Sequence, residues 1–144
     1  MTTHRFIVWS LRAMVAGFAA TGLLFIATPD GVLDAIADAG DALGSFSESP
    51  ATDQKLWLGL GFSYMIVIAA VALVAQADVV RFRPLLLVLA LGKTASSLSG
   101  LGFYLFDDEV FAYLLNFVVD GLLVVAALYL WRLAGKVAES SAPG

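Results

Sequence analysis

Four segments of this chain are apolar over unusually long stretches: residues 6–27, 56–76, 85–106 and 110–133. At ~1.5 Å per residue, each can cross the ~30 Å hydrocarbon layer of a bilayer as an α-helix. Hydrophobic residues make up 60% of the sequence and charged residues 14%, whereas soluble domains carry about 25% charged residues. The sequence therefore predicts an all-α protein, a four-helix bundle of transmembrane helices.

The segment between the first two apolar spans has a different pattern. Pro29 is expected to end the first helix, because proline has no amide hydrogen and clashes with the preceding turn. From residue 30 to 46, apolar side chains recur at helical spacing on one side and aspartates on the other, which predicts an amphipathic helix. A turn-rich loop covers residues 44–53. Polar residues 137–144 are predicted to form a disordered tail, which leaves a single membrane domain over residues 1–136.

Charged residues are distributed unequally between the two ends of the predicted bundle. Nine of the twelve carboxylates fall on the side that holds the amphipathic segment and the turn 107–109. By the positive-inside rule, both termini are expected in the cytoplasm and the amphipathic helix outside, in a bacterial cytoplasmic membrane. A solvated surface is the simplest interpretation of the acidic side, and binding of a cation or a basic partner is the alternative. The basic residues on the opposite side are Arg5, Arg81, Arg83, Arg132 and Lys136.

The residue types present exclude several chemistries. The chain has no cysteine and one histidine, His4, so it lacks the ligands for disulfides, iron–sulfur clusters or a multi-histidine metal site. Its net charge of −4 argues against nucleic acid, which is bound by basic surfaces. It contains no glycine-rich phosphate loop, Ser-His-Asp set or zinc-ligand spacing. We therefore expect no cofactor, no metal site and no catalysis by this chain alone.

Two ionisable residues lie near the middle of the third and fourth spans. Lys93 and Asp120 are almost equally far in sequence from the acidic turn 107–109 that joins these spans. A helical hairpin would place them at one depth, where they can neutralise each other; either charge alone costs about 2.5–3.5 kcal/mol on insertion scales. Polar side chains at helical spacing extend the pair into a predicted intramembrane cluster. Its predicted members are Arg12, Tyr64, Lys93, Ser97, Tyr113, Asn116 and Asp120.

This cluster has two interpretations. A structural ion pair with hydrogen-bonded neighbours would fix the register of the helices, and this is the simpler interpretation. A polar pocket or a proton-linked site would make the cluster functional. Arg12 lies about two turns inside the first span. It either snorkels to the cytoplasmic headgroups or leaves one surplus positive charge that attracts an anionic headgroup, a carboxylate or a quinone-like carbonyl.

Small residues mark two predicted packing stripes, along which helix backbones can approach each other closely. Packing within the chain is the simpler expectation, and contact with another subunit is the alternative. The stripes are Ala13, Gly17 and Thr21 on the first span and Gly92, Ser96 and Gly100 on the third.

The order of these features resembles the DoxX-like superfamily of small four-helix bacterial membrane proteins. The resemblance rests on a first span with an embedded arginine (SLRAMVAGFAATGLLF, with Arg12 and Gly22), a break at Pro29, the segment GVLDAIADAGDALG, the basic link RFRP and a closing hairpin. It implies a quinone-linked oxidoreductase subunit or an accessory partner of redox enzymes. The second span departs from the family's pattern, because it offers Ser63 and Tyr64 where a buried carboxylate is expected.

Two roles remain open from the sequence. Little of the chain lies outside the predicted bilayer, which favours a non-catalytic accessory or structural subunit of a larger membrane complex, of respiratory or redox type. Its partners would be membrane lipids and other membrane subunits or a second copy. The alternative is a membrane binding or transport protein for a lipid-like or anionic small molecule, held by Arg12, Lys93 and Asp120. A closed Lys93–Asp120 contact without a cavity favours the first role, and a cavity with unpaired polar groups favours the second.

Overall fold

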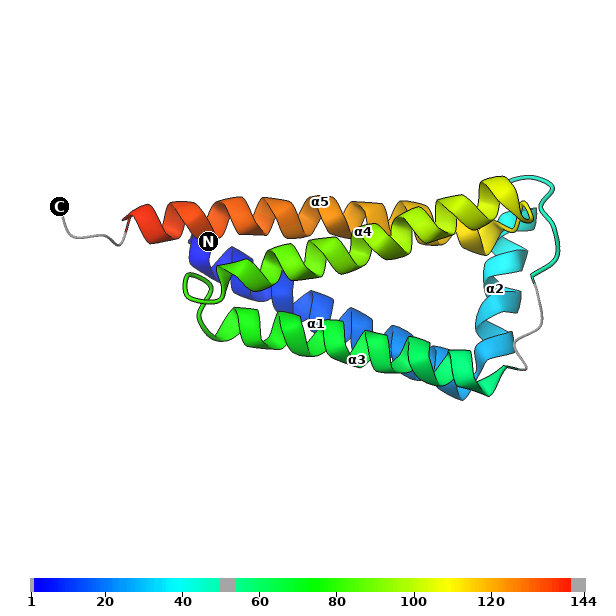
Figure 1. The fold of residues 1–144 in the computed structure, drawn as a ribbon, viewed down its shortest axis with the longest axis horizontal. Helices are drawn as coiled ribbons and strands as arrows, with labels where there is room; N and C mark the ends of the chain where they lie inside the picture. Colours follow the sequence, from blue (N-terminus) through cyan, green and yellow to red (C-terminus); the bar gives the residue numbers. More distant parts are fainter. Residues whose placement is uncertain (1, 50–53, 141–144) are drawn as a thin grey trace.

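The computed structural model describes residues 2–49 and 54–140 and contains five α-helices within them (Figure 1). They are α1 (Thr3–Ala27), α2 (Pro29–Asp41), α3 (Lys55–Ala77), α4 (Arg83–Phe106) and α5 (Phe111–Ser140). All but α2 are long and apolar enough to cross a membrane. The prediction of an all-helical fold with four apolar candidate spans is therefore confirmed.

The C-terminal end of α5 differs from the sequence prediction. The helix continues through Ser140, so residues 137–140 are helical and the prediction of a disordered tail is wrong for them. Residues 138 and 139 are Ala and Glu, which favour helix, and no proline interrupts this stretch. Residues 141–144 lie outside the described part of the chain.

The second helix begins as the sequence predicts but ends earlier. Thr28, which precedes Pro29, has a non-helical backbone (φ −142°, ψ 60°), and the chain turns there from α1 into α2. α2 ends at Asp41 and not near residue 46. Phe46 instead leaves the helical path and packs on Phe111, with ring centroids 5.0 Å apart. Residues 50–53 of the predicted loop lie outside the described residues.

The four long helices form two antiparallel pairs, α1 with α3 and α4 with α5, each packed along its length. The pairs lie close together at the end that holds the N-terminus and the α3–α4 link, and they diverge toward the opposite end (Figure 1). α2 runs across this wide end, roughly perpendicular to the other helices (Figure 1). The bundle is therefore a wedge, with α2 closing its open side.

The apolar core occupies the narrow part of the wedge. At this end, Arg83 at the start of α4 joins α4 to α5. Its Nε donates to the Trp131 carbonyl oxygen at 2.9 Å, and its guanidinium lies 4.0 Å from the centroid of the Trp131 ring. Gly135 leaves room for this guanidinium, since a Cβ there would lie 2.9 Å from an Arg83 nitrogen. The buried apolar residues are Ile7, Leu11, Phe18, Ile68, Ala69, Ala72, Ala75, Val79, Leu86, Leu89, Ala90, Ala127, Leu130 and Ala134.

α2 is held at the wide end by contacts with the beginning of α5. Gly40 is buried, and a Cβ at this position would lie 2.8 Å from the Phe111 Cβ, so the two helices meet at close range. Beyond α2, the Ser47 amide donates to the Glu109 carbonyl oxygen at 3.1 Å. Val32, Leu33, Ile36 and Ala37 of α2 are partly buried, whereas Asp34 and Asp38 are exposed. One side of α2 therefore faces the space between the two helix pairs.

Candidate functional site

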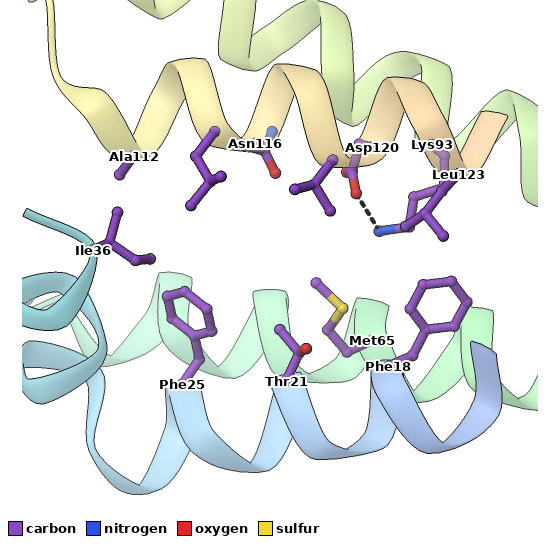
Figure 2. Close-up of a pocket in the computed structure, with 12 residues that line it drawn as sticks. Phe18, Thr21, Phe25, Ile36, Met65, Lys93, Ala112, Asn116, Asp120 and Leu123 are labelled. Carbon is purple, nitrogen blue, oxygen red and sulfur yellow. Dashed lines mark hydrogen bonds and ion pairs between the residues drawn. The ribbon is translucent and has the colours of Figure 1, made fainter. Parts of the chain in front are cut away.

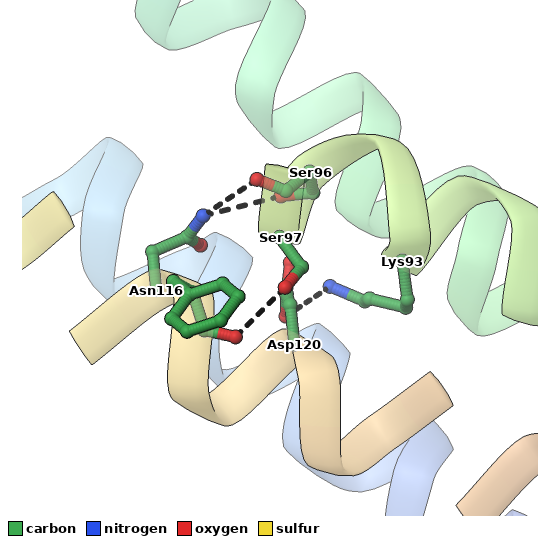
Figure 3. Close-up of polar contacts among 6 residues, drawn as sticks. Lys93, Ser96, Ser97, Asn116 and Asp120 are labelled. Carbon is green, nitrogen blue, oxygen red and sulfur yellow. Dashed lines mark hydrogen bonds and ion pairs between the residues drawn. The ribbon is translucent and has the colours of Figure 1, made fainter. Parts of the chain in front are cut away.

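The Lys93 and Asp120 side chains meet as the hairpin geometry requires. Lys93 Nζ donates to Asp120 Oδ1 at 3.0 Å (Figure 3). Both side chains are buried, with 2% and 7% of their side-chain surface exposed. Because α4 and α5 are antiparallel and joined by a short turn, similar sequence distances from that turn give similar depths in the bundle. The two charges neutralise each other where the packed half of the wedge ends.

Two aromatic rings complete the surroundings of the lysine. The ammonium group lies 4.9 Å from the centroid of the Phe18 ring and 5.5 Å from that of Tyr64. Both distances are within the range of cation–π attraction, which contributes about 0.5–2 kcal/mol per contact. Phe18 belongs to α1 and Tyr64 to α3, so the lysine joins all four long helices at one point.

The other polar side chains of the hairpin are engaged by the facing helix. Ser97 Oγ donates to the Phe117 carbonyl oxygen at 2.8 Å, and Asn116 Nδ2 donates to the Ser96 carbonyl oxygen at 3.0 Å (Figure 3). These bonds fix the register between α4 and α5, since each one joins a side chain to a backbone position on the other helix. They also set the Asn116 amide, so that its oxygen points away from α4.

A cavity of about 250 Å³ begins at the ion pair and extends toward α2 (Figure 2). Lys93 and Asp120 form its polar end, and Phe25, Ile36 and Ala112 lie at the other end (Figure 2). Nine of its twelve lining residues belong to α1 and α5, so the cavity lies mainly between these two helices. The full lining is Phe18, Thr21, Phe25, Ile36, Met65, Lys93, Ala112, Leu115, Asn116, Val119, Asp120 and Leu123.

Two polar atoms at this site are buried without a hydrogen-bond partner among the described residues: Asp120 Oδ2 and the Tyr64 hydroxyl oxygen. Leaving a buried polar group unpaired costs about 1–3 kcal/mol, and more for a charged group. The Asn116 side-chain oxygen also faces the cavity (Figure 2). The polar end of the cavity can therefore accept hydrogen bonds from a bound molecule.

The structure separates Arg12 from the predicted cluster, which corrects the sequence interpretation. Arg12 is exposed; its Nε donates to Gln76 Oε1 at 3.2 Å, and its guanidinium lies 5.2 Å from the Trp9 ring centroid. The reason is helical periodicity. Arg12 precedes Phe18 by six residues, which corresponds to a rotation of about 240° and places it on another side of α1. The surplus positive charge expected near the ion pair is therefore absent from the cavity.

Tyr113 also lies apart from the cavity. Its ring packs on Phe103, with centroids 5.6 Å apart, at the acidic end of the α4–α5 hairpin. Tyr64 is brought to the site, since its ring flanks Lys93 from the α3 side. Of the seven predicted cluster members, the structure thus gathers Tyr64, Lys93, Ser97, Asn116 and Asp120.

The two predicted packing stripes behave differently. On α4, a Cβ at Gly92 would lie 3.1 Å from the Tyr64 hydroxyl and one at Gly100 would lie 2.8 Å from the Tyr113 carbonyl oxygen, so this stripe packs within the chain. On α1, Ala13 and Gly17 are exposed, and a Cβ at Gly17 would meet nothing within 4 Å. Thr21, the third member of that stripe, lines the cavity instead. The expectation of packing within the chain is therefore wrong for Ala13 and Gly17.

Sequence reasoning missed the apolar lining of the cavity. Phe18, Thr21 and Phe25 follow one another at three- and four-residue spacing along α1, which is the signal of a single helix face. The same spacing marks ordinary packing surfaces, so this signal does not reveal a cavity.

Elsewhere in residues 2–49 and 54–140, no three histidine or acidic side chains converge to hold a metal ion.

Comparisons with protein-family models, with curated proteins and with solved structures found no match to this chain. The resemblance to the DoxX-like superfamily therefore stays a prediction from the layout of the sequence. The site must be interpreted from its own geometry.

Proposed function

We propose that this chain is an integral membrane protein that binds a lipid-like small molecule in the cavity between α1 and α5. The observation that carries the proposal is that Asp120, which lines a mostly apolar cavity, has a buried Oδ2 with no hydrogen-bond partner among residues 2–49 and 54–140. An apolar cavity with a few convergent polar groups is the usual form of a small-molecule site. The proposed role is binding, and no catalytic step is assigned to any residue.

The cavity distinguishes this role from that of a purely structural ion pair. Transmembrane helices associate through close van der Waals packing, so we expect a purely structural ion pair to be surrounded by closely packed helices. Here the two helix pairs pack against each other on one side of the Lys93–Asp120 contact and diverge from each other on the other side. A volume of about 250 Å³ exceeds the ~150 Å³ apolar cavity that binds benzene in an engineered protein.

The orientation in the membrane that we propose follows from the distribution of basic and acidic residues between the two ends of the bundle. Both termini and the α3–α4 link, which carries Arg81, face the cytoplasm, and α2 lies on the outer surface with its exposed aspartates in water. The cavity then opens between α1 and α5 toward the outer leaflet. Because the chain has no cysteine, single cysteines at Asp108 and Glu139 can report this topology. A membrane-impermeant maleimide should label the first from outside intact cells and leave the second unlabelled; the reverse pattern would contradict the topology.

Native mass spectrometry after gentle extraction from the source membrane tests the proposed function. Val119 lines the cavity, so Val119→Trp fills it with a large side chain. Leu122 lies on the same helix, is 65% exposed and does not line the cavity, so Leu122→Trp is the matched control. We expect a noncovalent small-molecule mass on the unaltered protein and on Leu122→Trp, and its loss from Val119→Trp. An adduct that survives in Val119→Trp, or no adduct on any of the three, would refute the proposal.

A second candidate role is that of an accessory or structural subunit of a larger membrane complex. The exposed small residues Ala13 and Gly17 favour it, because they leave a face of α1 onto which another helix backbone can pack closely. The same mass spectra separate the two roles. A stable assembly with other polypeptides that carries no small molecule would support the accessory role and exclude the binding role.

A further inference from the structure

The charge balance of the cavity constrains what can bind in it. Lys93 and Asp120 are the two ionisable residues among its lining, and they are already paired at 3.0 Å. Arg12, the other cation that the sequence placed within the predicted spans, bonds to Gln76 outside the cavity. The polar end therefore has no net charge. A charged head group of a ligand would lie close to one charge of its own sign. The charge of opposite sign would already be neutralised within the Lys93–Asp120 pair.

The polar end of the cavity offers both acceptors and donors of hydrogen bonds. Asp120 Oδ2 accepts no hydrogen bond from the described residues, and the Asn116 oxygen faces the cavity. The Lys93 ammonium has three hydrogens and donates one of them to Asp120 Oδ1. A bound group that both donates to a carboxylate and accepts from an ammonium matches this arrangement. A hydroxyl group does both without carrying a charge.

The size and lining of the cavity constrain the rest of the ligand. About 250 Å³ corresponds to roughly eight water volumes at ~30 Å³ each, which holds a polar head and a short piece of chain. Beyond the polar end, the walls are apolar, with Phe25, Leu115 and Val119 among them. Val119 is also 45% exposed, so a longer tail can leave the cavity beside it, between α1 and α5.

Resting on the proposed function, we infer that the ligand of this cavity is a neutral long-chain alcohol. Its hydroxyl group donates to Asp120 Oδ2 and accepts from Lys93 Nζ, and its tail runs along Val119 into the hydrocarbon of the membrane. The Lys93–Asp120 pair thus binds an uncharged hydroxyl head group and does not bind an anion.

A competition experiment with three probes of equal tail length tests this inference. The protein, in lipid nanodiscs, is labelled with a dodecanol that carries a photoreactive diazirine midway along its tail, and crosslinks are mapped by mass spectrometry. Unlabelled dodecanol, its methyl ether and dodecanesulfonate then compete. The ether keeps the oxygen acceptor but lacks the donor hydrogen, and the sulfonate is permanently anionic. A hydrogen bond to a charged group is stronger than one between neutral groups, so dodecanol should compete roughly tenfold better than either analogue, or more.

Each outcome of this competition has a separate meaning. Crosslinks on the cavity walls of α1 and α5 that dodecanol competes best would support the inference. Equal competition by the ether would overturn it, because the donor hydrogen would then contribute nothing. Strongest competition by the sulfonate would overturn it in favour of an anionic head, with the proposed function intact. If none of the three unlabelled competitors reduced the photolabelling of the cavity walls, the proposed function itself would be refuted.

A double variant supplies an independent readout. Replacing Lys93 by Met and Asp120 by Leu removes the polar end while keeping side chains of similar volume, so the preference for dodecanol over its ether should disappear. Ser99→Ala is the control, because Ser99 is exposed and bonds to its own helix at the Ala95 carbonyl oxygen. It should keep the preference. A preference that persists in the folded double variant would contradict the assigned contacts, and the probe series on the unaltered chain decides the inference if that variant does not fold.

Discussion

Replacing Asp120 by alanine is expected to lower the free energy of unfolding by about 3–5 kcal/mol, the range found when one partner of a buried ion pair is removed. The variant leaves the Lys93 ammonium buried, with 2% of its side-chain surface exposed and the rings of Phe18 and Tyr64 beside it. Lys93→Ala should have an effect of similar size, because it leaves the Asp120 carboxylate buried without its cation. Unfolding in mixed micelles, followed by circular dichroism, measures both effects.

The same experiment on the Lys93→Met, Asp120→Leu double variant tests whether the two residues act as a pair. With both charges removed and volume retained, we expect most of the stability to return, since replacing a buried pair by apolar residues is often neutral or better. The exposed Ser99→Ala variant should change the free energy of unfolding by less than about 0.5 kcal/mol. Losses from the two single alanine variants that add up in the double variant would show that Lys93 and Asp120 do not interact.

Replacing Gly100 by alanine is expected to destabilise the α4–α5 hairpin by about 1–3 kcal/mol, the usual effect of overpacking. The added Cβ would lie 2.8 Å from the Tyr113 carbonyl oxygen and 3.2 Å from the Phe117 amide nitrogen. Both atoms belong to the backbone of α5, so the helices must separate to make room. The separation would also stretch the bond from Asn116 to the Ser96 carbonyl oxygen, which is 3.0 Å long.

Gly102 provides the matched control on the same helix. A Cβ at Gly102 would meet nothing within 4 Å. Gly102→Ala should therefore stabilise α4 by about 0.5–1 kcal/mol, because alanine loses less backbone entropy than glycine within a helix. Unfolding curves for the two variants in the same micelles make the comparison. Equal effects of the two substitutions would mean that α4 and α5 do not approach each other closely at Gly100.

The four long apolar helices and the ion pair could be predicted from the sequence for a physical reason. An apolar run of about 20 residues is long enough to cross hydrocarbon as a helix, and a charge inside such a run is costly there unless it is paired. The short turn between α4 and α5 then fixes the depth of Lys93 and Asp120, so two local constraints determine one contact. Neither constraint depends on how the remaining helices pack.

Arg12 and the cavity could not be predicted, because both depend on how α1 is rotated and tilted against its neighbours. The sequence gives the depth of Arg12 in its span but not the direction in which its side chain points. The wide end between the two helix pairs is bridged by α2 and the segment after it, through long-range contacts such as those of Gly40 with Phe111 and of Ser47 with Glu109. No local pattern specifies these contacts.

An intermolecular nuclear Overhauser experiment can show whether a molecule occupies the cavity between α1 and α5. The protein is purified with its retained molecule, labelled at the methyl groups of Met, Leu and Val, and transferred into nanodiscs of deuterated lipid. We expect cross-peaks from protons of the retained molecule to the methyls of Met65 and Val119, which line the cavity, and none to Leu122 or Val125, which are exposed and lie outside it. Equal cross-peaks at both sets of methyls, or none at Met65 and Val119, would contradict the claim that this cavity is a ligand site.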